Sequence, residues 1–223
     1  MIAEGAVTVL GTIRTKPSFQ VDDGMPTDAV TISRAAHPFV SRGGEKLAAA
    51  LAAFSLSPRG ATALDVGASS GGFTDCLLKN GAERVFAVDA GHAQLDPSLA
   101  ADPRVLSFEG YNARFLTRAD LPAVPEFAVM DVSFISATLI IPALAATIAE
   151  GAPFVCLVKP QFEVGREGLG KGGIVRDDRL RRIAVERVVA SATACGLLHI
   201  GTIDSPILGG DGNREYLAAF RKE

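Results

Sequence analysis

The fold is decided by the stretch Ala63-Leu64-Asp65-Val66-Gly67-Ala68-Ser69-Ser70-Gly71-Gly72-Phe73-Thr74. The run from Thr62 to Val66 is short, mainly apolar and followed by a glycine, which is typical of a buried parallel strand. The glycines that follow allow the backbone to turn sharply and to approach a ligand closely. A helix beginning near Gly72 presents N–H groups that favour an anionic group. The stretch therefore predicts a ligand site between a strand and a helix.

A second acidic residue follows the next apolar run. Asp89 comes 22 residues after Gly67, directly after Val85-Phe86-Ala87-Val88. A carboxylate at the carboxyl end of a neighbouring parallel strand is placed to bind the hydroxyls of a ribose. Together, the glycine loop and this acid predict a nucleoside cofactor on an α/β sheet.

The composition narrows the class of protein. The 223 residues are enough for one sizeable core and an appendage. No apolar run is long enough to span a bilayer and no signal pattern is present, so we expect no membrane association and a cytoplasmic location. Three distant cysteines with no zinc-like spacing predict three buried thiols and no metal site. The net charge of −3 does not favour a non-specific nucleic-acid binder, although a local basic face remains compatible with it.

Strand and helix patterns alternate from residue 61 onward, which implies a parallel sheet with right-handed crossovers. The segment from Ser205 to Arg214 is too short for a helical crossover, so the last two strands should be antiparallel. We therefore predict an α/β fold: a Rossmann-like, seven-stranded, mostly parallel sheet with an antiparallel last strand and helices on both faces, as in S-adenosylmethionine methyltransferases. The expected strands are 62–66, 84–89, 105–109, 127–131, 153–158, 198–204 and 216–220. The main helices are one that follows Ser41 and ends at Phe54, and those over about 72–80, 137–150 and 177–195.

The first 36 residues differ from the rest of the chain. Residues 3–11 and 28–32 have strand patterns, and Asp22-Asp23-Gly24 marks a turn. With Lys16-Pro17, this segment resembles the second half of an S4-type RNA-binding domain; an irregular extension is the alternative. We expect three parts: an S4-like segment over 1–36, a linker with a lead-in helix over 37–60, capped by Ser41, and the main domain over 61–223.

The glycine loop reads Gly67-x-x-x-Gly71-Gly72 rather than the dinucleotide pattern, which is a weak signal alone. Together with the antiparallel closing strand, it favours S-adenosylmethionine as the cofactor. Loop amides can bind its carboxylate, Asp65 and Asp131 can face its cationic region, Asp89 its ribose and Asn112 its adenine. Loop N–H groups that satisfy Asp65, and a turn-forming role of Asn112, are the alternatives. The predicted cofactor residues are Asp65, Gly67, Ala68, Ser69, Gly71, Gly72, Phe73, Asp89, Asn112 and Asp131.

Two acids and two lysines are expected to meet above the cofactor. Asp131 and Lys159 end neighbouring strands, and Glu215 begins the antiparallel strand beside Lys159. Lys46 lies in the helix before the first strand of the main domain, after two glycines. A solvated salt bridge is the common explanation for any one of them. As a set at strand ends, however, they favour a catalytic site.

Five motifs resemble the TlyA family, whose members are often labelled hemolysin A and which is related to the FtsJ/RrmJ-type 2′-O-methyltransferases. They are residues 40–47 (VSRGGEKL), 65–74 (DVGASSGGFT), 131–136 (DVSFIS), 157–163 (LVKPQFE) and 212–216 (GNREY). The resemblance covers about residue 37 to the end and implies methyl transfer from S-adenosylmethionine to the ribose 2′-hydroxyl of cytidines in ribosomal RNA. It maps a catalytic tetrad onto Lys46, Asp131, Lys159 and Glu215. The helical first half of the family's S4 domain has no counterpart in this sequence.

The chemistry requires help for a weak nucleophile, the ribose hydroxyl. We expect Lys159 to contact the 2′-oxygen, either accepting its proton or steering its lone pair. Asp131 and Glu215 would tune that lysine, and Lys46 would position the ribose or compensate charge. Ribosomal RNA or a ribosomal subunit is the expected partner. Candidate phosphate contacts are Arg42, Arg166, Lys171 and Arg176, with further arginines at 179, 181 and 182; a solvated helix face is the alternative. Phe134 and Phe162 can stack a base, although core packing is the simpler expectation.

Three other functions compete with this interpretation. An NAD-linked oxidoreductase explains Gly67 and Asp89 but leaves the tetrad without a role. A pore-forming cytolysin, which the hemolysin label suggests, conflicts with the composition and the complete cofactor site. A ribosome-binding module without catalysis conflicts with the intact tetrad.

Overall fold

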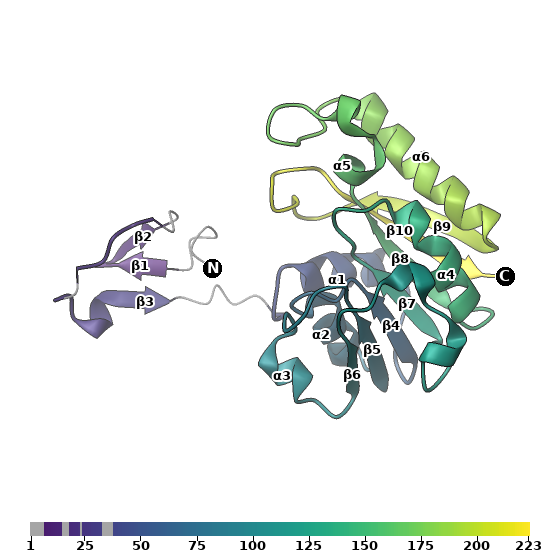
Figure 1. Cartoon of the computed structure of the whole chain (residues 1–223), viewed down its shortest axis with the longest axis horizontal. Helices are drawn as coiled ribbons and strands as arrows, with labels where there is room; N and C mark the ends of the chain where they lie inside the picture. Colours follow the sequence, from purple (N-terminus) through teal and green to yellow (C-terminus); the bar gives the residue numbers. More distant parts are fainter. Residues whose placement is uncertain (1–6, 15–17, 23, 33–37) are drawn as a thin grey trace. The chain divides into compact units, whose positions relative to one another are not determined.

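The computed structural model describes residues 7–14, 18–22, 24–32 and 38–223, and the chain divides into two compact units, Met1–Pro38 and Phe39–Glu223 (Figure 1). Several predicted features lie outside the described residues: the strand pattern over 3–6, Lys16-Pro17, Asp23 in the turn, and His37 at the start of the linker.

The N-terminal unit is a small antiparallel sheet. Its strands are β1 (Val7–Val9), β2 (Thr12–Arg14) and β3 (Val30–Ile32), in the order β2-β1-β3, with the 3-10 helix η2 (Thr27–Ala29) before β3. Leu10 and Gly11 join β1 to β2 with positive φ angles of 49° and 72°. Two consecutive positive φ angles are what a two-residue hairpin turn matched to the strand twist requires.

The main unit contains a seven-stranded sheet in the order β6-β5-β4-β7-β8-β10-β9. The first five of these strands run parallel, and β10 runs antiparallel to both β8 and β9. This confirms the predicted fold, including the antiparallel last strand. The strands are β4 (Thr62–Val66), β5 (Arg84–Val88), β6 (Val105–Phe108), β7 (Phe127–Met130), β8 (Pro153–Val158), β9 (Leu197–Asp204) and β10 (Tyr216–Lys222).

Helices cover both faces of this sheet because the strands are apolar on both sides. On β4, Ala63 packs toward α1 (Gly43–Ala53), α2 (Gly72–Lys79) and α3 (Pro97–Ala100), whereas Leu64 and Val66 pack toward α4 (Ile141–Thr147) and α6 (Asp178–Ala194). Alternation of this kind follows from the twofold side-chain period of a strand. The remaining helical turns are η3 (Ala113–Phe115), η4 (Arg118–Asp120), η5 (Ala137–Leu139), α5 (Pro160–Glu163) and η6 (Arg166–Gly168).

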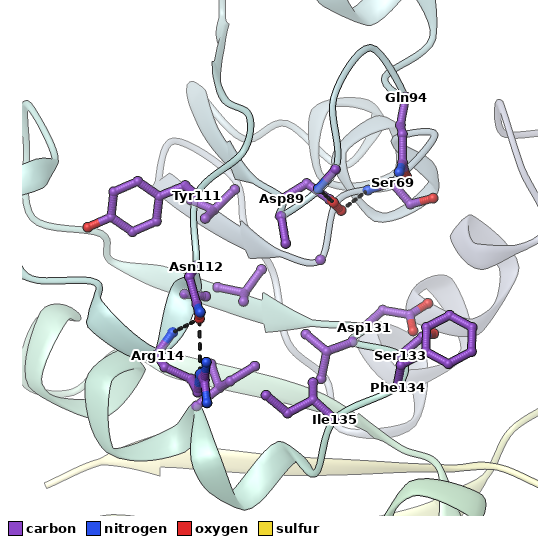
Figure 2. A pocket seen from close by; sticks show the side chains of 18 residues that line it. Ser69, Asp89, Gln94, Tyr111, Asn112, Arg114, Asp131, Ser133, Phe134 and Ile135 are labelled. Carbon is purple, nitrogen blue, oxygen red and sulfur yellow. Dashed lines mark hydrogen bonds between the residues drawn. The ribbon is translucent and has the colours of Figure 1, made fainter.

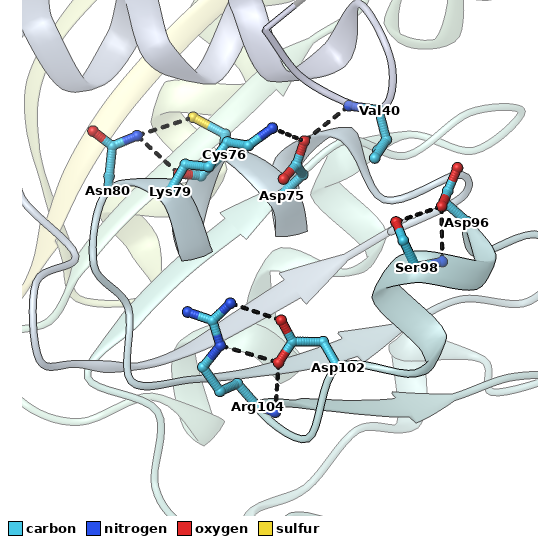
Figure 3. Close-up of polar contacts among 9 residues, drawn as sticks. All are labelled: Val40, Asp75, Cys76, Lys79, Asn80, Asp96, Ser98, Asp102 and Arg104. Carbon is cyan, nitrogen blue, oxygen red and sulfur yellow. Dashed lines mark hydrogen bonds and ion pairs between the residues drawn. The ribbon is translucent and has the colours of Figure 1, made fainter.

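Polar contacts on α2 and α3 fix the segments around the glycine loop (Figure 3). The Asp75 carboxylate accepts the Val40 N–H at 2.8 Å and contacts the Lys79 ammonium at 2.8 Å. Asp96 caps α3 by accepting the Ser98 N–H at 2.9 Å. The segment before α1 is thereby attached to α2, the helix that follows the glycine loop.

Three local predictions were wrong. Ser41 does not cap α1, because the N-cap is Arg42 and no side-chain capping bond forms there. The helix predicted over 137–150 is divided into η5 and the shorter α4, since Pro142 lies in the first turn of α4, where its missing N–H is tolerated. Cys195 is only partly buried, whereas Cys76 and Cys156 are buried as expected.

Candidate functional site

The glycine loop between β4 and α2 is tightly folded, and its sequence explains why. Gly67 has a φ of 85°, and a Cβ atom there would lie 2.3 Å from the Asp131 carbonyl oxygen. Gly71 has a φ of 93°, and its Cβ would lie 2.3 Å from a methyl carbon of Leu99. Side chains at these positions would be strained and would also collide with neighbours. The loop therefore passes close to the end of β7, where Asp131 lies.

A cavity of about 560 Å³ opens at the carboxyl ends of β4, β5 and β7 (Figure 2). This volume lies in the range of small-molecule sites, and the place is where open α/β sheets bind ligands. Five of the predicted cofactor residues line it: Gly67, Ser69, Asp89, Asn112 and Asp131. Five others do not line it: Asp65, Ala68, Gly71, Gly72 and Phe73. The cavity is also lined by residues that were not predicted, among them Gln94, Tyr111, Arg114, Ser133 and Ile135.

The five predicted cofactor residues that do not line the cavity are buried in the fold around the glycine loop. The Phe73 side chain is 3% exposed and packs with α1 in the core. A Cβ at Gly72 would lie 2.2 Å from the Ser41 hydroxyl oxygen and 3.0 Å from the Gly44 nitrogen. The glycines of the two motifs thus allow the N-termini of α1 and α2 to pack closely.

Asp89 and Asn112 lie on different walls of the cavity (Figure 2). One carboxylate oxygen of Asp89 accepts the Ser69 N–H at 2.8 Å and the other accepts the Gly91 N–H at 2.7 Å. An ionised carboxylate has about four acceptor positions, so Asp89 can still accept ribose hydroxyls. Asn112 caps η3, its side-chain oxygen accepting the Arg114 N–H at 3.2 Å. The turn-forming role of Asn112 is therefore present, at a position that also faces the cavity.

Asp65 lies fully buried behind the cavity. Its Oδ2 accepts a hydrogen bond from the Thr74 hydroxyl at 2.7 Å, and its Oδ1 has no hydrogen-bond partner among the described residues. Burial raises the pKa of Asp65 to about 7, and the negative charges of Asp131 and Asp89 act in the same direction. Three carboxylates therefore lie near enough to interact at this end of the sheet, which suits a cationic ligand.

The raised pKa of Asp65 predicts how stability changes with pH. The native state holds this proton up to about pH 7, but the unfolded chain releases it near pH 4. Because the native state then binds more protons than the unfolded state, the free energy of unfolding falls as the pH rises from 4 to 7. Asp65→Asn removes this dependence. Its stability relative to the wild type should increase by about 2 kcal/mol between pH 5 and pH 7, as measured by urea unfolding. A difference that does not change with pH would contradict the assignment.

The tetrad predicted from the sequence forms two ion pairs. Lys46 Nζ lies 2.6 Å from Glu215 Oε2, and Lys159 Nζ lies 2.6 Å from Asp131 Oδ1. The side chains of the first pair are 10% and 3% exposed, and those of the second are 12% and 21% exposed. The antiparallel register pairs Tyr216 with Val158, so Glu215 and Lys159 adjoin the paired ends of β10 and β8. The sequence did not predict which lysine pairs with which acid.

The loop after β7 carries two further residues that line the cavity, Ser133 and Phe134. The Lys159 ammonium donates a hydrogen bond to Ser133 Oγ at 2.7 Å. Phe134 has a φ of 64°, is 92% exposed and lines the cavity, so the expectation that it packs in the core was wrong. Its ring centroid lies 5.4 Å from that of Phe162. The only sequence signal for Ser133 was its place within the motif that begins at Asp131.

The basic residues predicted to contact phosphate differ in exposure. After β8, Arg166, Lys171 and Arg176 are exposed. Arg42, at the start of α1, is half-buried. Arg181 is engaged in the fold, because it contacts Asp178 and donates to the Val175 carbonyl at 2.9 Å. For this arginine the structural alternative therefore holds. The exposed residues remain candidates for phosphate contact.

Asn213 holds the glycine-rich segment after η6 against the loop before β10. Its buried side chain accepts the Val175 N–H at 3.0 Å and donates to the Gly173 carbonyl at 3.1 Å. Asn213→Ala would leave a buried N–H without an acceptor, so we expect a loss of about 1–3 kcal/mol in the free energy of unfolding. Limited proteolysis should also cleave the chain faster between residues 165 and 173. Asn80→Ala at the exposed end of α2 serves as the control, and equal stability of the two variants would contradict the prediction.

The structure offers no helix long and apolar enough to cross a membrane within the part of the chain that it describes. Nor does that part contain a cluster of three or more His, Cys, Asp or Glu side chains arranged to hold a metal ion.

Comparison with known proteins gives a family match and close relatives. Residues 39–222 match the family model described as FtsJ-like methyltransferase. A relative from Mycobacterium tuberculosis, named 16S/23S rRNA (cytidine-2′-O)-methyltransferase TlyA, is 42% identical over all of this chain and 82% of its own length. A solved structure of a candidate hemolysin from Streptococcus thermophilus is 45% identical, with a TM-score of 0.85 over 99% of this chain and 80% of that one.

A distant solved structure shares the fold. It is described as a candidate S-adenosylmethionine-dependent methyltransferase from Listeria monocytogenes and is 13% identical. The TM-score is 0.60, over 82% of this chain and 100% of that one. The fold is thus compatible with a very different sequence.

Proposed function

Since the chain belongs to the FtsJ-like methyltransferase family, we propose that it transfers the methyl group of S-adenosylmethionine to the ribose 2′-hydroxyl of cytidine in ribosomal RNA. The observation that carries the proposal is the Lys159–Asp131 ion pair. Asp131 lines the cavity at the carboxyl edge of the sheet, and Lys159 lies 2.6 Å from it. This places a cation that can interact with a hydroxyl oxygen next to a nucleoside-sized cavity.

The residues around the cavity fit S-adenosylmethionine. Apolar walls from Val66, Val88 and Ile135 suit the adenine, and Asp89 has acceptor positions for the ribose hydroxyls. The negative charges of Asp131, which lines the cavity, and of Asp89 suit the cationic part of the cofactor. When bound, this cofactor supplies an electrophilic methyl group on a sulfonium. The chain's own task is to hold the acceptor oxygen in line and to deal with its proton.

The tetrad has separate tasks in this proposal. As the 2′-oxygen bonds to the methyl carbon, the carbon–sulfur bond breaks and the hydroxyl proton must leave. Lys159 contacts the oxygen and Asp131 holds Lys159 in place. As a neutral amine Lys159 would accept the proton; as an ammonium it would orient the lone pair, and the proton would leave to water. Glu215 and Lys46 form the second, more buried pair beside it and position the ribose.

The RNA contacts are proposed to surround this site. Phe134 is almost fully exposed at the cavity and is placed to stack on a base. Exposed Arg166, Lys171 and Arg176, together with Arg42, are proposed to contact phosphates. We also propose that residues 1–36 act as an S4-like RNA-binding segment and residues 37–60 as a linker and lead-in helix, with catalysis in 61–223. A ribosomal RNA or subunit as substrate implies action in the cytoplasm.

The proposal is tested by methyl labelling. Ribosomal RNA is incubated with the chain and S-adenosylmethionine carrying a radioactive methyl group, then digested to nucleosides. We expect label in 2′-O-methylcytidine, and label only in base-methylated nucleosides would refute the proposal. Calorimetry with S-adenosylmethionine and NAD tests the oxidoreductase alternative, and leakage from liposomes tests the cytolysin alternative. Binding of NAD alone, or leakage caused by the pure chain, would favour those functions.

A further inference from the structure

Ser133 is the residue of the candidate site whose contact the proposed function leaves unexplained. It follows β7 by three positions, is exposed and lines the cavity. Its hydroxyl oxygen accepts a hydrogen bond from the Lys159 ammonium at 2.7 Å. The same ammonium lies 2.6 Å from Asp131 Oδ1. Two residues of one loop, separated by only one position, therefore contact the lysine that we place at the reaction centre.

The two contacts of the Lys159 ammonium in the described part of the chain leave one of its hydrogen-bonding directions unused. A lysine side chain carries three N–H donors and has no acceptor when charged. One donor is used for the hydrogen bond to Ser133, the ion pair with Asp131 fixes a second direction, and no third polar contact of this ammonium is present among the described residues. Together, the two contacts restrict rotation about the end of the side chain. The remaining hydrogen-bonding position thereby acquires a defined direction.

The loop that carries both residues is held at each end. The Asp131 N–H donates to the Val66 carbonyl at 2.9 Å, which attaches one end to β4. At the other end, the buried Glu163 carboxylate accepts the Ser136 hydroxyl at 2.6 Å and the Ala137 N–H at 2.7 Å. Between these ends, Phe134 adopts a left-handed backbone conformation that is unfavourable for its residue type. A loop fixed in this way can hold the Ser133 hydroxyl at a constant place.

We propose that Ser133 is a positioning residue for Lys159. Its hydroxyl and the Asp131 carboxylate together orient the lysine nitrogen so that its remaining position is open to the ribose 2′-oxygen. The inference rests on the proposed function, because it assumes that Lys159 meets a hydroxyl there. Ser133 itself does not take up the proton and acts on the reaction through Lys159.

Ser133→Ala tests the proposal with little risk to the fold, because the side chain is exposed. The single-turnover rate of methyl transfer to ribosomal RNA should fall by roughly 10- to 100-fold, as expected for loss of a hydrogen bond to a charged group. Because Ser133 lines the cavity, the rate is measured at saturating S-adenosylmethionine, so that the loss reports a step after cofactor binding. Ser133→Thr keeps the hydroxyl and should restore most of the rate.

Ser136→Ala is the matched control on the same loop. It removes a hydroxyl that contacts Glu163 rather than Lys159, and the Ala137 N–H still attaches the loop to Glu163. The rate loss should therefore be clearly smaller than for Ser133→Ala. A wild-type rate in Ser133→Ala, or equal losses in the two serine variants, would refute the positioning role. Failure of the wild-type chain to methylate any ribose would instead refute the proposed function, and this inference with it.

Discussion

Lys159→Ala should lower the rate of methyl transfer by roughly 10²- to 10⁴-fold, the range that a positioned acid–base group contributes. The reason is geometric, because Lys159 is the cation held beside the cavity by Asp131 at 2.6 Å and by Ser133 at 2.7 Å. Binding of S-adenosylmethionine should persist, since Lys159 does not line the cavity. Single-turnover assays with calorimetry of cofactor binding separate the two effects.

A matched control for this variant is available on α2. Lys79 also pairs with an aspartate, Asp75, at 2.8 Å, but its side chain is 51% exposed and does not line the cavity. Lys79→Ala should therefore leave the transfer rate near the wild-type value. Near wild-type transfer by Lys159→Ala would show that this lysine has no role in the chemistry.

Breaking the Lys46–Glu215 pair should have the largest effect on stability. Both side chains are buried, so Glu215→Ala leaves the Lys46 charge without its partner. Removing one member of a buried ion pair typically costs about 3–5 kcal/mol, which urea unfolding would measure. The double variant Lys46→Met/Glu215→Leu removes both charges and should recover much of that loss.

The same double variant separates a structural role from a functional one. If the pair positions the ribose, the double variant should be folded and still transfer methyl groups much more slowly than the wild type. Recovery of both stability and transfer rate would mean that the pair serves the fold alone. Cofactor affinity, measured in parallel, should be little changed because neither residue lines the cavity.

Much of the fold could be predicted because the signals were local and repeated. The short segment 205–214 leaves no room for a crossover helix, and β10 is indeed antiparallel to β9. The predicted methyltransferase family is confirmed by the match over residues 39–222. Two of the wrong predictions concerned the ends of helices, which the periodicity of apolar residues does not define. Pro142 shortens α4, and the turn before α1 places Arg42 rather than Ser41 at the N-cap.

The candidate site was predictable in its location but only partly in its contacts. Strand ends gave the positions of Asp131 and Lys159, because parallel strands bring their carboxyl ends to one edge. Which acid pairs with which lysine depends on side-chain directions across four segments, and sequence spacing does not define them. Ser133 and Phe134 depend on the conformation of one loop, including a positive φ at a phenylalanine.

Mapping 2′-O-methyl groups on ribosomal RNA tests whether the chain methylates ribose and whether Lys159 is needed for it. RNA treated with S-adenosylmethionine and either the wild-type chain or Lys159→Ala is copied by reverse transcriptase at limiting nucleotide concentration, which pauses synthesis at 2′-O-methylated positions. The account predicts a new pause at a cytidine with the wild-type chain and none with the variant. The same pause with both proteins, or methylation by the wild-type chain without any ribose modification, would contradict it.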